Sequence, residues 1–247
     1  MESKRYAILD SFRGLVLISM IAYHTVWDMV YIFGEKWGWY KSDLAYAWQQ
    51  SICWSFILLS GFCWSFGKVK WRRGMTVLVA GLVISVVTML VMPQNRILFG
   101  VLTLLGSCMM LMIPLECVLK HVKPEIGMLT SFVIFLFVRH INDGYLGFGE
   151  WELVELPEAL YSNLFMTYLG FTEASFFSTD YFSLLPWCFL FITGYFLYQV
   201  FAERQLLQHL HKGKNQVLER LGKHSLVVYM LHQPLVYGVL NLVYMIE

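Results

Sequence analysis

Residues 6–33 read YAILDSFRGLVLISMIAYHTVWDMVYIF, and this stretch decides the fold class. It is long and apolar enough to cross a bilayer as one helix, for which about 20 residues suffice. Six more stretches approach this length, at about residues 44–66, 75–92, 97–119, 126–140, 182–201 and 225–246, of which the fourth, 126–140, is the shortest and weakest. The sequence therefore predicts an all-α bundle of about seven transmembrane helices, formed by a single domain over residues 1–247.

The composition of the whole chain agrees with an integral membrane protein. Of its 247 residues, 58% are hydrophobic and only 14% are charged, whereas about 25% are charged in soluble domains. The formal net charge of +1 argues against a nucleic-acid-binding protein, which needs a basic surplus on one face. The five cysteines lie in apolar runs without the spacing of a metal or redox site. We therefore expect reduced packing cysteines and no metal cofactor.

The distribution of basic residues predicts the orientation. With the N-terminus inside, thirteen Lys and Arg residues fall on inner segments and four on outer ones, and the positive excess marks the cytoplasmic side. We therefore expect the N-terminus inside and the C-terminus outside. The longest connection, at about residues 141–181, then lies outside the cytoplasm. Its middle, residues 153–171, is amphipathic but contains Pro157, which favours an interfacial or re-entrant segment over an eighth span.

The first stretch carries four ionisable side chains at membrane depth, where such groups are costly unless they are paired or face a cavity. Arg13 and His24 are eleven residues apart, close to three helical turns or about 16 Å along the axis. Asp10 lies one turn from Arg13, and Asp28 lies one turn from His24. The spacing predicts a polar stripe that faces the bundle interior.

Two readings of this stripe remain open. In the structural reading, Asp10 pairs with Arg13 at the inner interface, and Asp28 pairs with His24 to fix helix packing. In the functional reading, Asp28 sets the tautomer of His24. His24 then acts as a general base or as a nucleophile that holds an acyl group.

Further candidate polar residues lie in or near the other stretches: Ser60, Arg72, Arg73, Asp180, His232 and Gln233. The hydroxyl of Ser60 either bonds its own helix backbone or belongs to a site. Arg72 and Arg73 either set the topology or contact a cytosolic phosphate. His232, next to Gln233 and a proline that interrupts the last stretch, is expected to line a cavity.

The first stretch also resembles a known family. The segments 9–14, LDSFRG, and 20–24, MIAYH, resemble the first span of the membrane acyltransferases of the heparan-alpha-glucosaminide N-acetyltransferase catalytic-domain family. Arg13 and His24 are also similar to the Arg-x10-His signature of the related acyltransferase-three family. Further matching segments run from end to end of the chain, at residues 56–62, 99–102, 180–187 and 222–234.

The resemblance implies an enzyme that takes an acyl group, usually acetyl, from acyl-CoA in the cytosol. It delivers the group across the membrane to a carbohydrate or other small acceptor, commonly through a sugar hydroxyl or an amine. His24 is carried over as the catalytic residue, assisted by Asp28, and Arg13 as the residue near CoA. Further candidates for the CoA site are Arg72, Arg73 and Ser60, and those for the acceptor site are Trp27, Asp180, His232 and Gln233.

Two departures leave the acceptor chemistry open. Lysosomal members carry Asn in place of His24 and a reactive His in the outer loop, where this chain has none, and Thr103 stands where a His often occurs. We expect the long outer connection at about residues 141–181 to shape the acceptor pocket. We also expect the plasma membrane of a bacterium as the location, and a monomer and a homodimer are both compatible with the sequence.

A transporter is the alternative function. In that reading Arg13, His24 and Asp28 form a relay for protons or a small molecule rather than a catalytic unit. The chain shows no inverted repeat, and seven spans do not divide into two equal halves. The enzyme is therefore the preferred reading, and binding of acyl-CoA distinguishes the two.

Overall fold

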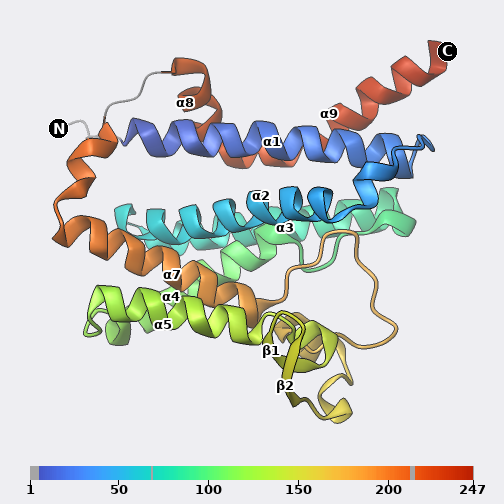
Figure 1. Ribbon diagram of the computed structural model, residues 1–247. Coiled ribbons are helices and arrows are strands. Elements are labelled where there is room, and N and C mark those ends of the chain that lie inside the picture. Colours follow the sequence, from blue (N-terminus) through green and yellow to red (C-terminus); the bar gives the residue numbers. More distant parts are fainter. Residues whose placement is uncertain (1–5, 68, 212–214, 247) are drawn as a thin grey trace. The chain divides into compact units, whose positions relative to one another are not determined.

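The computed structural model describes residues 6–67, 69–211 and 215–246 (Figure 1). The chain forms two compact units, one made of Met1–Phe56 with Arg204–Glu247 and the other of Ile57–Glu203. The helices are α1 (Ala7–Tyr31), α2 (Asp43–Phe62), α3 (Lys70–Val91), α4 (Val101–Leu119), α5 (Pro124–Val138), α6 (Leu164–Leu169), α7 (Leu184–Glu203), α8 (Gln216–Lys223) and α9 (Ser225–Ile246). The two strands are β1 (Tyr145–Phe148) and β2 (Trp151–Glu155).

The prediction of an all-α membrane protein is confirmed. Each of the seven apolar stretches forms a helix. Within the described residues, six helical segments are long and apolar enough to cross a membrane: Ala7–Tyr31, Lys70–Val91, Val101–Leu119, Pro124–Asp143, Leu184–Glu203 and Ser225–Met245. Helix α2 is not among them, since polar residues such as Gln49 and Gln50 interrupt its first half.

The orientation with the N-terminus inside stays a prediction. Five of the cations that support it lie outside the described residues: Lys4, Arg5, Lys68, Lys212 and Lys214. The other cations lie on or between the described helices.

The long connection contains a hairpin and a short helix, and the interfacial or re-entrant character of residues 153–171 stays a prediction. Its first part is an antiparallel hairpin in which Phe148 pairs with Trp151. Gly149, with φ of 59°, occupies the first position of the two-residue turn, where a left-handed conformation suits the twist of the strands. Helix α6 follows after an Asn163 cap, whose side chain accepts from the Met166 N–H at 3.0 Å. Its six residues are too few to form an eighth span.

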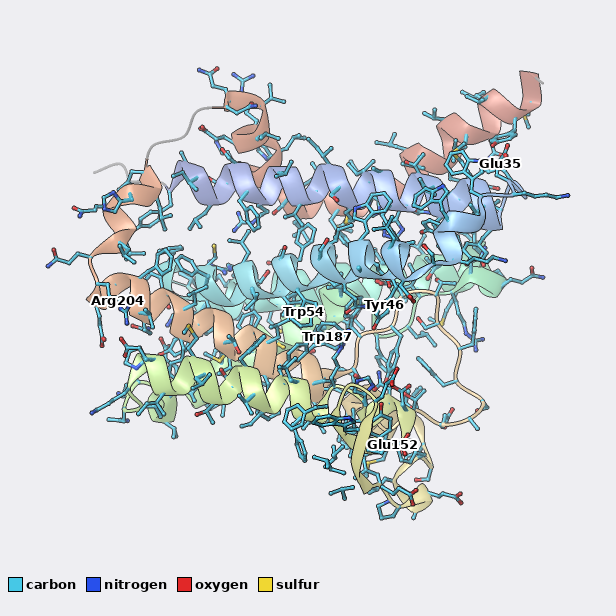
Figure 2. All side chains as sticks on the ribbon, viewed as in Figure 1. Glu35, Tyr46, Trp54, Glu152, Trp187 and Arg204 are labelled. Carbon is cyan, nitrogen blue, oxygen red and sulfur yellow. The ribbon has the colours of Figure 1, made fainter. Side chains whose placement is uncertain are left out.

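In the first unit, α1 packs against α8 and α9 (Figure 1). Glycines permit the approach of α8, because a Cβ on Gly14 would overlap the Leu218 carbonyl and one on Gly222 would overlap the Asp10 carbonyl. Such small residues let helix backbones approach closely in membranes. Beyond α1, Glu35 accepts a hydrogen bond from Tyr244 of α9 at 2.9 Å (Figure 2).

In the second unit, α3 packs on α4, and α7 packs on both α4 and α5. The C-terminal end of α2 also meets α7 through two glycines. A Cβ on Gly61 would overlap the Phe191 carbonyl, and one on Gly194 would overlap the Leu58 carbonyl. This close crossing is the structural reason for a glycine after Ser60, in one of the segments that carry the family resemblance.

Candidate functional site

His24 of α1 faces His232 of α9 within the first unit. The centroids of the two imidazole rings are 4.9 Å apart, and the ring planes are tilted by 57°. His24 is half-buried, whereas His232 is only 7% exposed. The Nδ1 of His232 bonds to the backbone carbonyl of Tyr229, one turn earlier in α9. The structure therefore brings together two histidines from opposite ends of the chain.

Asp28 lies one turn after His24 and is fully buried. The side-chain amide Nε2 of Gln233 donates to its Oδ1 at 2.7 Å. Among the described residues no hydrogen bond joins Asp28 to His24, and Asp28 Oδ2 has no partner, so the role of Asp28 in setting the tautomer of His24 stays a prediction. The hydrogen bond of the Asp28 carboxylate therefore joins α1 to α9, because Gln233 reaches it from α9.

Three buried atoms of this cluster lack a hydrogen-bond partner among the described residues: Asp28 Oδ2, His232 Nε2 and Gln233 Oε1. Buried polar groups are normally paired, and those that are not tend to mark functional sites. A carboxylate oxygen and an amide oxygen can only accept. The cluster formed by His24, Asp28, His232 and Gln233, called the dyad cluster below, is therefore rich in acceptors.

We expect Asp28→Asn to reduce acyl transfer by about tenfold. This loss is smaller than the one expected when His24 is removed. The asparagine oxygen can still accept from Gln233, but the negative charge is lost, and its N–H group must find a buried acceptor. Initial rates of transfer by wild type and variant in detergent micelles measure the effect. A variant that transfers at the wild-type rate would remove Asp28 from the site.

Arg13 lies at the other end of the predicted stripe and forms the ion pair of the structural reading. Its Nη1 is 3.1 Å from Asp10 Oδ1, and both side chains are about one-fifth exposed. The same nitrogen lies 3.4 Å from the carbonyl of Gly222, in the last turn of α8. A cation is favourable at a helix C-terminus, so Arg13 also fastens α1 to α8.

Aromatic side chains surround the C-terminal half of α1. Trp27 contacts Tyr31, with ring centroids 5.3 Å apart, and Tyr23 contacts both Tyr40 and Trp48 at 5.2 Å. The Tyr40 hydroxyl donates to the Tyr23 carbonyl at 3.3 Å. Burial raises the pKa of Tyr40 well above its usual value. Tyr40 therefore stays protonated. Trp27 precedes Asp28 of the dyad cluster directly in α1.

Four of the predicted site residues belong to the second unit. Ser60 is half-buried in α2. The exposed Arg72 has its guanidinium 5.5 Å from the ring centroid of Trp71, and Arg73 donates to the Cys63 carbonyl at 3.0 Å. Asp180 Oδ2 accepts from the Val101 N–H at 3.3 Å, which places a negative charge at the start of α4. The role of Asp180 in binding the acceptor substrate stays a prediction.

Sequence reasoning missed two contacts of charged or buried polar groups. Lys70 pairs with Glu116, with Nζ 2.6 Å from Oε1. The only signal for this pair was a carboxylate near the end of an apolar stretch. The second is the bond between His232 and the Tyr229 carbonyl. A spacing of three residues permits it, but does not distinguish it from other uses of the imidazole.

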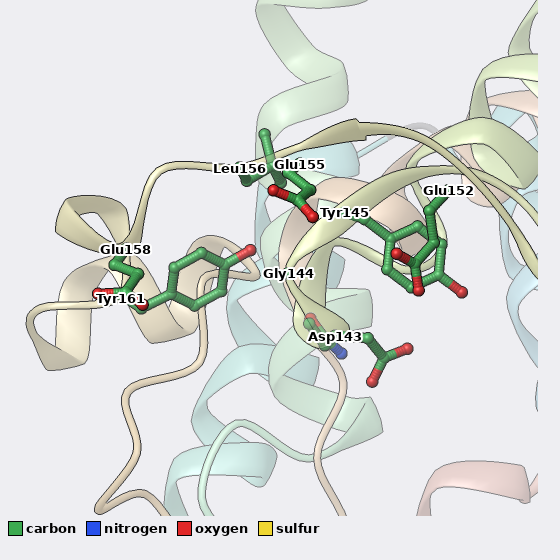
Figure 3. Close-up of a pocket in the computed structure, with 9 residues that line it drawn as sticks. Asp143, Gly144, Tyr145, Glu152, Glu155, Leu156, Glu158 and Tyr161 are labelled. Atoms are coloured by element: carbon green, nitrogen blue, oxygen red, sulfur yellow. The ribbon is translucent and has the colours of Figure 1, made fainter.

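The connection between α5 and α7 forms an open hollow of about 390 Å³ (Figure 3). Its lining includes four carboxylates, Asp143, Glu152, Glu155 and Glu158. Tyr161 closes one side, and its hydroxyl donates to the Ile141 carbonyl at 2.6 Å. Burial, with a smaller contribution from Asp143, raises the pKa of Tyr161. A lining of this sign attracts cations and repels anions.

The chain was compared with protein families, curated proteins and solved structures. A family model described as "Heparan-alpha-glucosaminide N-acetyltransferase, catalytic" matches residues 5–234. The matched range includes Arg13, the dyad cluster and all the candidate residues of the second unit. No curated protein and no solved structure matches the chain.

Proposed function

Because the chain belongs to the heparan-alpha-glucosaminide N-acetyltransferase catalytic-domain family, we propose that it transfers an acyl group from acyl-CoA across the membrane. The family is one of acyltransferases, and acetyl is the expected group. Cytosolic acetyl-CoA is the proposed donor. The proposed acceptor is a sugar hydroxyl or amine, or another small nucleophile, on the opposite side. The proposed location is the plasma membrane of a bacterium.

The observation that best supports this proposal is the dyad cluster, whose His24 and Asp28 lie on a helix long enough to cross a membrane. His24 is half-buried, it contacts a second histidine at 4.9 Å, and it lies one turn from a fully buried carboxylate. An imidazole in this setting can take the proton of the acceptor O–H or N–H while the acceptor attacks the thioester carbon. The C–S bond then breaks, and the CoA thiolate takes that proton.

A covalent route uses the same residue. An unprotonated nitrogen of His24 attacks the thioester carbonyl, the CoA thiolate leaves, and the acyl group is held on the ring. The acceptor O–H or N–H then attacks the acyl carbon, the bond between the acyl group and the ring nitrogen breaks, and the CoA thiolate takes the acceptor proton, so that His24 is freed. Both routes need His24 with one unprotonated nitrogen.

The cations proposed to bind CoA are placed separately on the two units. Arg13 is oriented by Asp10 and by the Gly222 carbonyl, and its guanidinium carries five N–H donors in total. Arg72 is exposed, and guanidinium groups pair well with phosphate oxygens. Arg73 and Ser60 are the further candidates for CoA. For the acceptor we propose Trp27, Gln233 and Asp180, and we expect the outer connection to shape its pocket.

We expect Arg72→Ala to weaken binding of acetyl-CoA by about tenfold, because one charge-assisted contact to a phosphate is lost. Binding of S-acetyl-pantetheine, which has the thioester without the phosphates, should not change. Isothermal titration of the purified protein in detergent micelles measures both affinities. Lys36→Ala removes an exposed cation from a segment predicted to lie outside and is the control.

The same titration separates the enzyme from the transporter. An acyltransferase binds acetyl-CoA in the absence of any acceptor. A protein that binds neither acetyl-CoA nor a longer acyl-CoA contradicts the proposed function and favours the transporter. The structure adds an argument against a relay along α1, because Asp28 bonds to Gln233 rather than to His24.

A further inference from the structure

We infer that His232 is the positioning residue of His24, and that it accepts a hydrogen bond from the N–H of the His24 ring. This inference rests on the proposed function in one respect only, namely that His24 is the reacting base or nucleophile. It assigns to a second histidine the task that a carboxylate performs in many catalytic sites. Among the described residues no hydrogen bond joins Asp28 to His24, and Asp28 Oδ1 accepts from Gln233 instead.

The bond to Tyr229 determines which nitrogen of His232 carries the proton. A backbone carbonyl can only accept, so the Nδ1 that bonds to it must be the N–H donor. In a neutral imidazole the other nitrogen is then an acceptor with a free lone pair. That nitrogen, Nε2, is buried and has no partner among the described residues.

His24 supplies the donor that His232 Nε2 lacks. The other unpaired atoms of the dyad cluster, Asp28 Oδ2 and Gln233 Oε1, are acceptors and cannot satisfy it. A neutral His24 carries one N–H, and its ring already lies against that of His232, with centroids 4.9 Å apart. Bonds of this kind are often long or poorly aligned before substrate binds.

The bond has a chemical consequence for His24. Its N–H is used by His232, so its other nitrogen is the one without a proton, as both proposed routes require. When that nitrogen takes the proton from the acceptor, the N–H that faces His232 becomes the donor of a charge-assisted hydrogen bond, which is the stronger kind. His232 neither gains nor loses a proton in this step.

The test combines a spectroscopic and a kinetic measurement on the full-length protein in detergent micelles. Protein labelled with 15N-histidine is compared as wild type, His232→Leu and His232→Gln, and His24→Ala assigns the His24 signals. We expect one tautomer of His24 in the wild type and a mixture of tautomers in His232→Leu. The kcat for acyl transfer should fall by about tenfold to a hundredfold in His232→Leu, with an unchanged KM for acetyl-CoA.

The conservative variant and a control make the result specific. The side-chain oxygen of glutamine can replace Nε2 as an acceptor, so His232→Gln should restore a single His24 tautomer and most of the kcat. His224→Leu removes an exposed histidine next to α9 and should leave both readouts unchanged. Thermal unfolding of each variant shows that it is folded.

Two results would overturn the inference. One is an unchanged His24 spectrum in folded His232→Leu, and the other is an equal loss of kcat in the leucine and glutamine variants. If no form of the protein transfers an acyl group, the proposed function fails. The spectra still decide whether His232 positions His24, because they need no turnover.

Discussion

His24→Ala should abolish acyl transfer, with a loss of about a hundredfold to ten-thousandfold that reflects removal of a general base or a nucleophile. Binding of acetyl-CoA should persist, because the cations proposed to hold CoA are untouched. The fold should also persist, since His24 is only half-buried. The rate of transfer of radiolabelled acetyl groups from acetyl-CoA to a panel of monosaccharides and amino sugars measures the loss.

The matched control for His24 is His209→Ala, because His209 is exposed and lies outside the proposed site. It should transfer at the wild-type rate. A folded His24→Ala protein that also transfers at this rate would show that the reacting group lies elsewhere, and the proposed mechanism would have to be abandoned.

The second large effect concerns stability. Gly222→Val should lower the free energy of unfolding by about 3 kcal/mol, at the upper end of the usual cost of overpacking. The new side chain would overlap the Asp10 backbone, which cannot yield as a flexible side chain does. For a chain of this length such a loss lowers the Tm by about 6–12 °C. Thermal unfolding in detergent micelles measures the shift.

Two further glycine variants test the same contact, one with a second overlap and one without any overlap. Gly14→Val should destabilise the protein in a similar way, because it faces the Leu218 backbone. Gly238→Ala in α9 meets no atom within 4 Å, and Ala is the better helix former. Its Tm should be unchanged or slightly raised. Wild-type stability of both valine variants would contradict the close contact of α1 with α8.

Much of the fold could be predicted because a bilayer demands long apolar helices, and the seven apolar stretches are helical. The hairpin of β1 and β2 was missed. Its second strand has only five residues, Trp151–Glu155, and the amphipathic pattern of residues 153–171 suggested an interfacial or re-entrant segment. A period of two cannot be distinguished from a helical period over so short a stretch.

The site was predictable only within one helix. The spacing of His24 and Asp28 placed both on one side of α1, because four residues make about one turn. Their partners come from α9, and Gln233 is 205 positions from Asp28 in the chain. No local pattern indicates such a pairing, so Asp28 was assigned to His24, its sequence neighbour. The ion pair of Arg13 with Asp10 is local, and the structural reading of these two residues includes it.

The central claim is that His24 reacts with, or activates attack on, a CoA thioester. It is tested most directly by incubating purified wild type and His24→Ala with acetyl-CoA and no acceptor, while intact-protein mass and released CoA thiol are followed. We predict slow CoA release or an acetyl adduct in the wild type, and neither in His24→Ala. Equal release or equal labelling of the two proteins would contradict the claim.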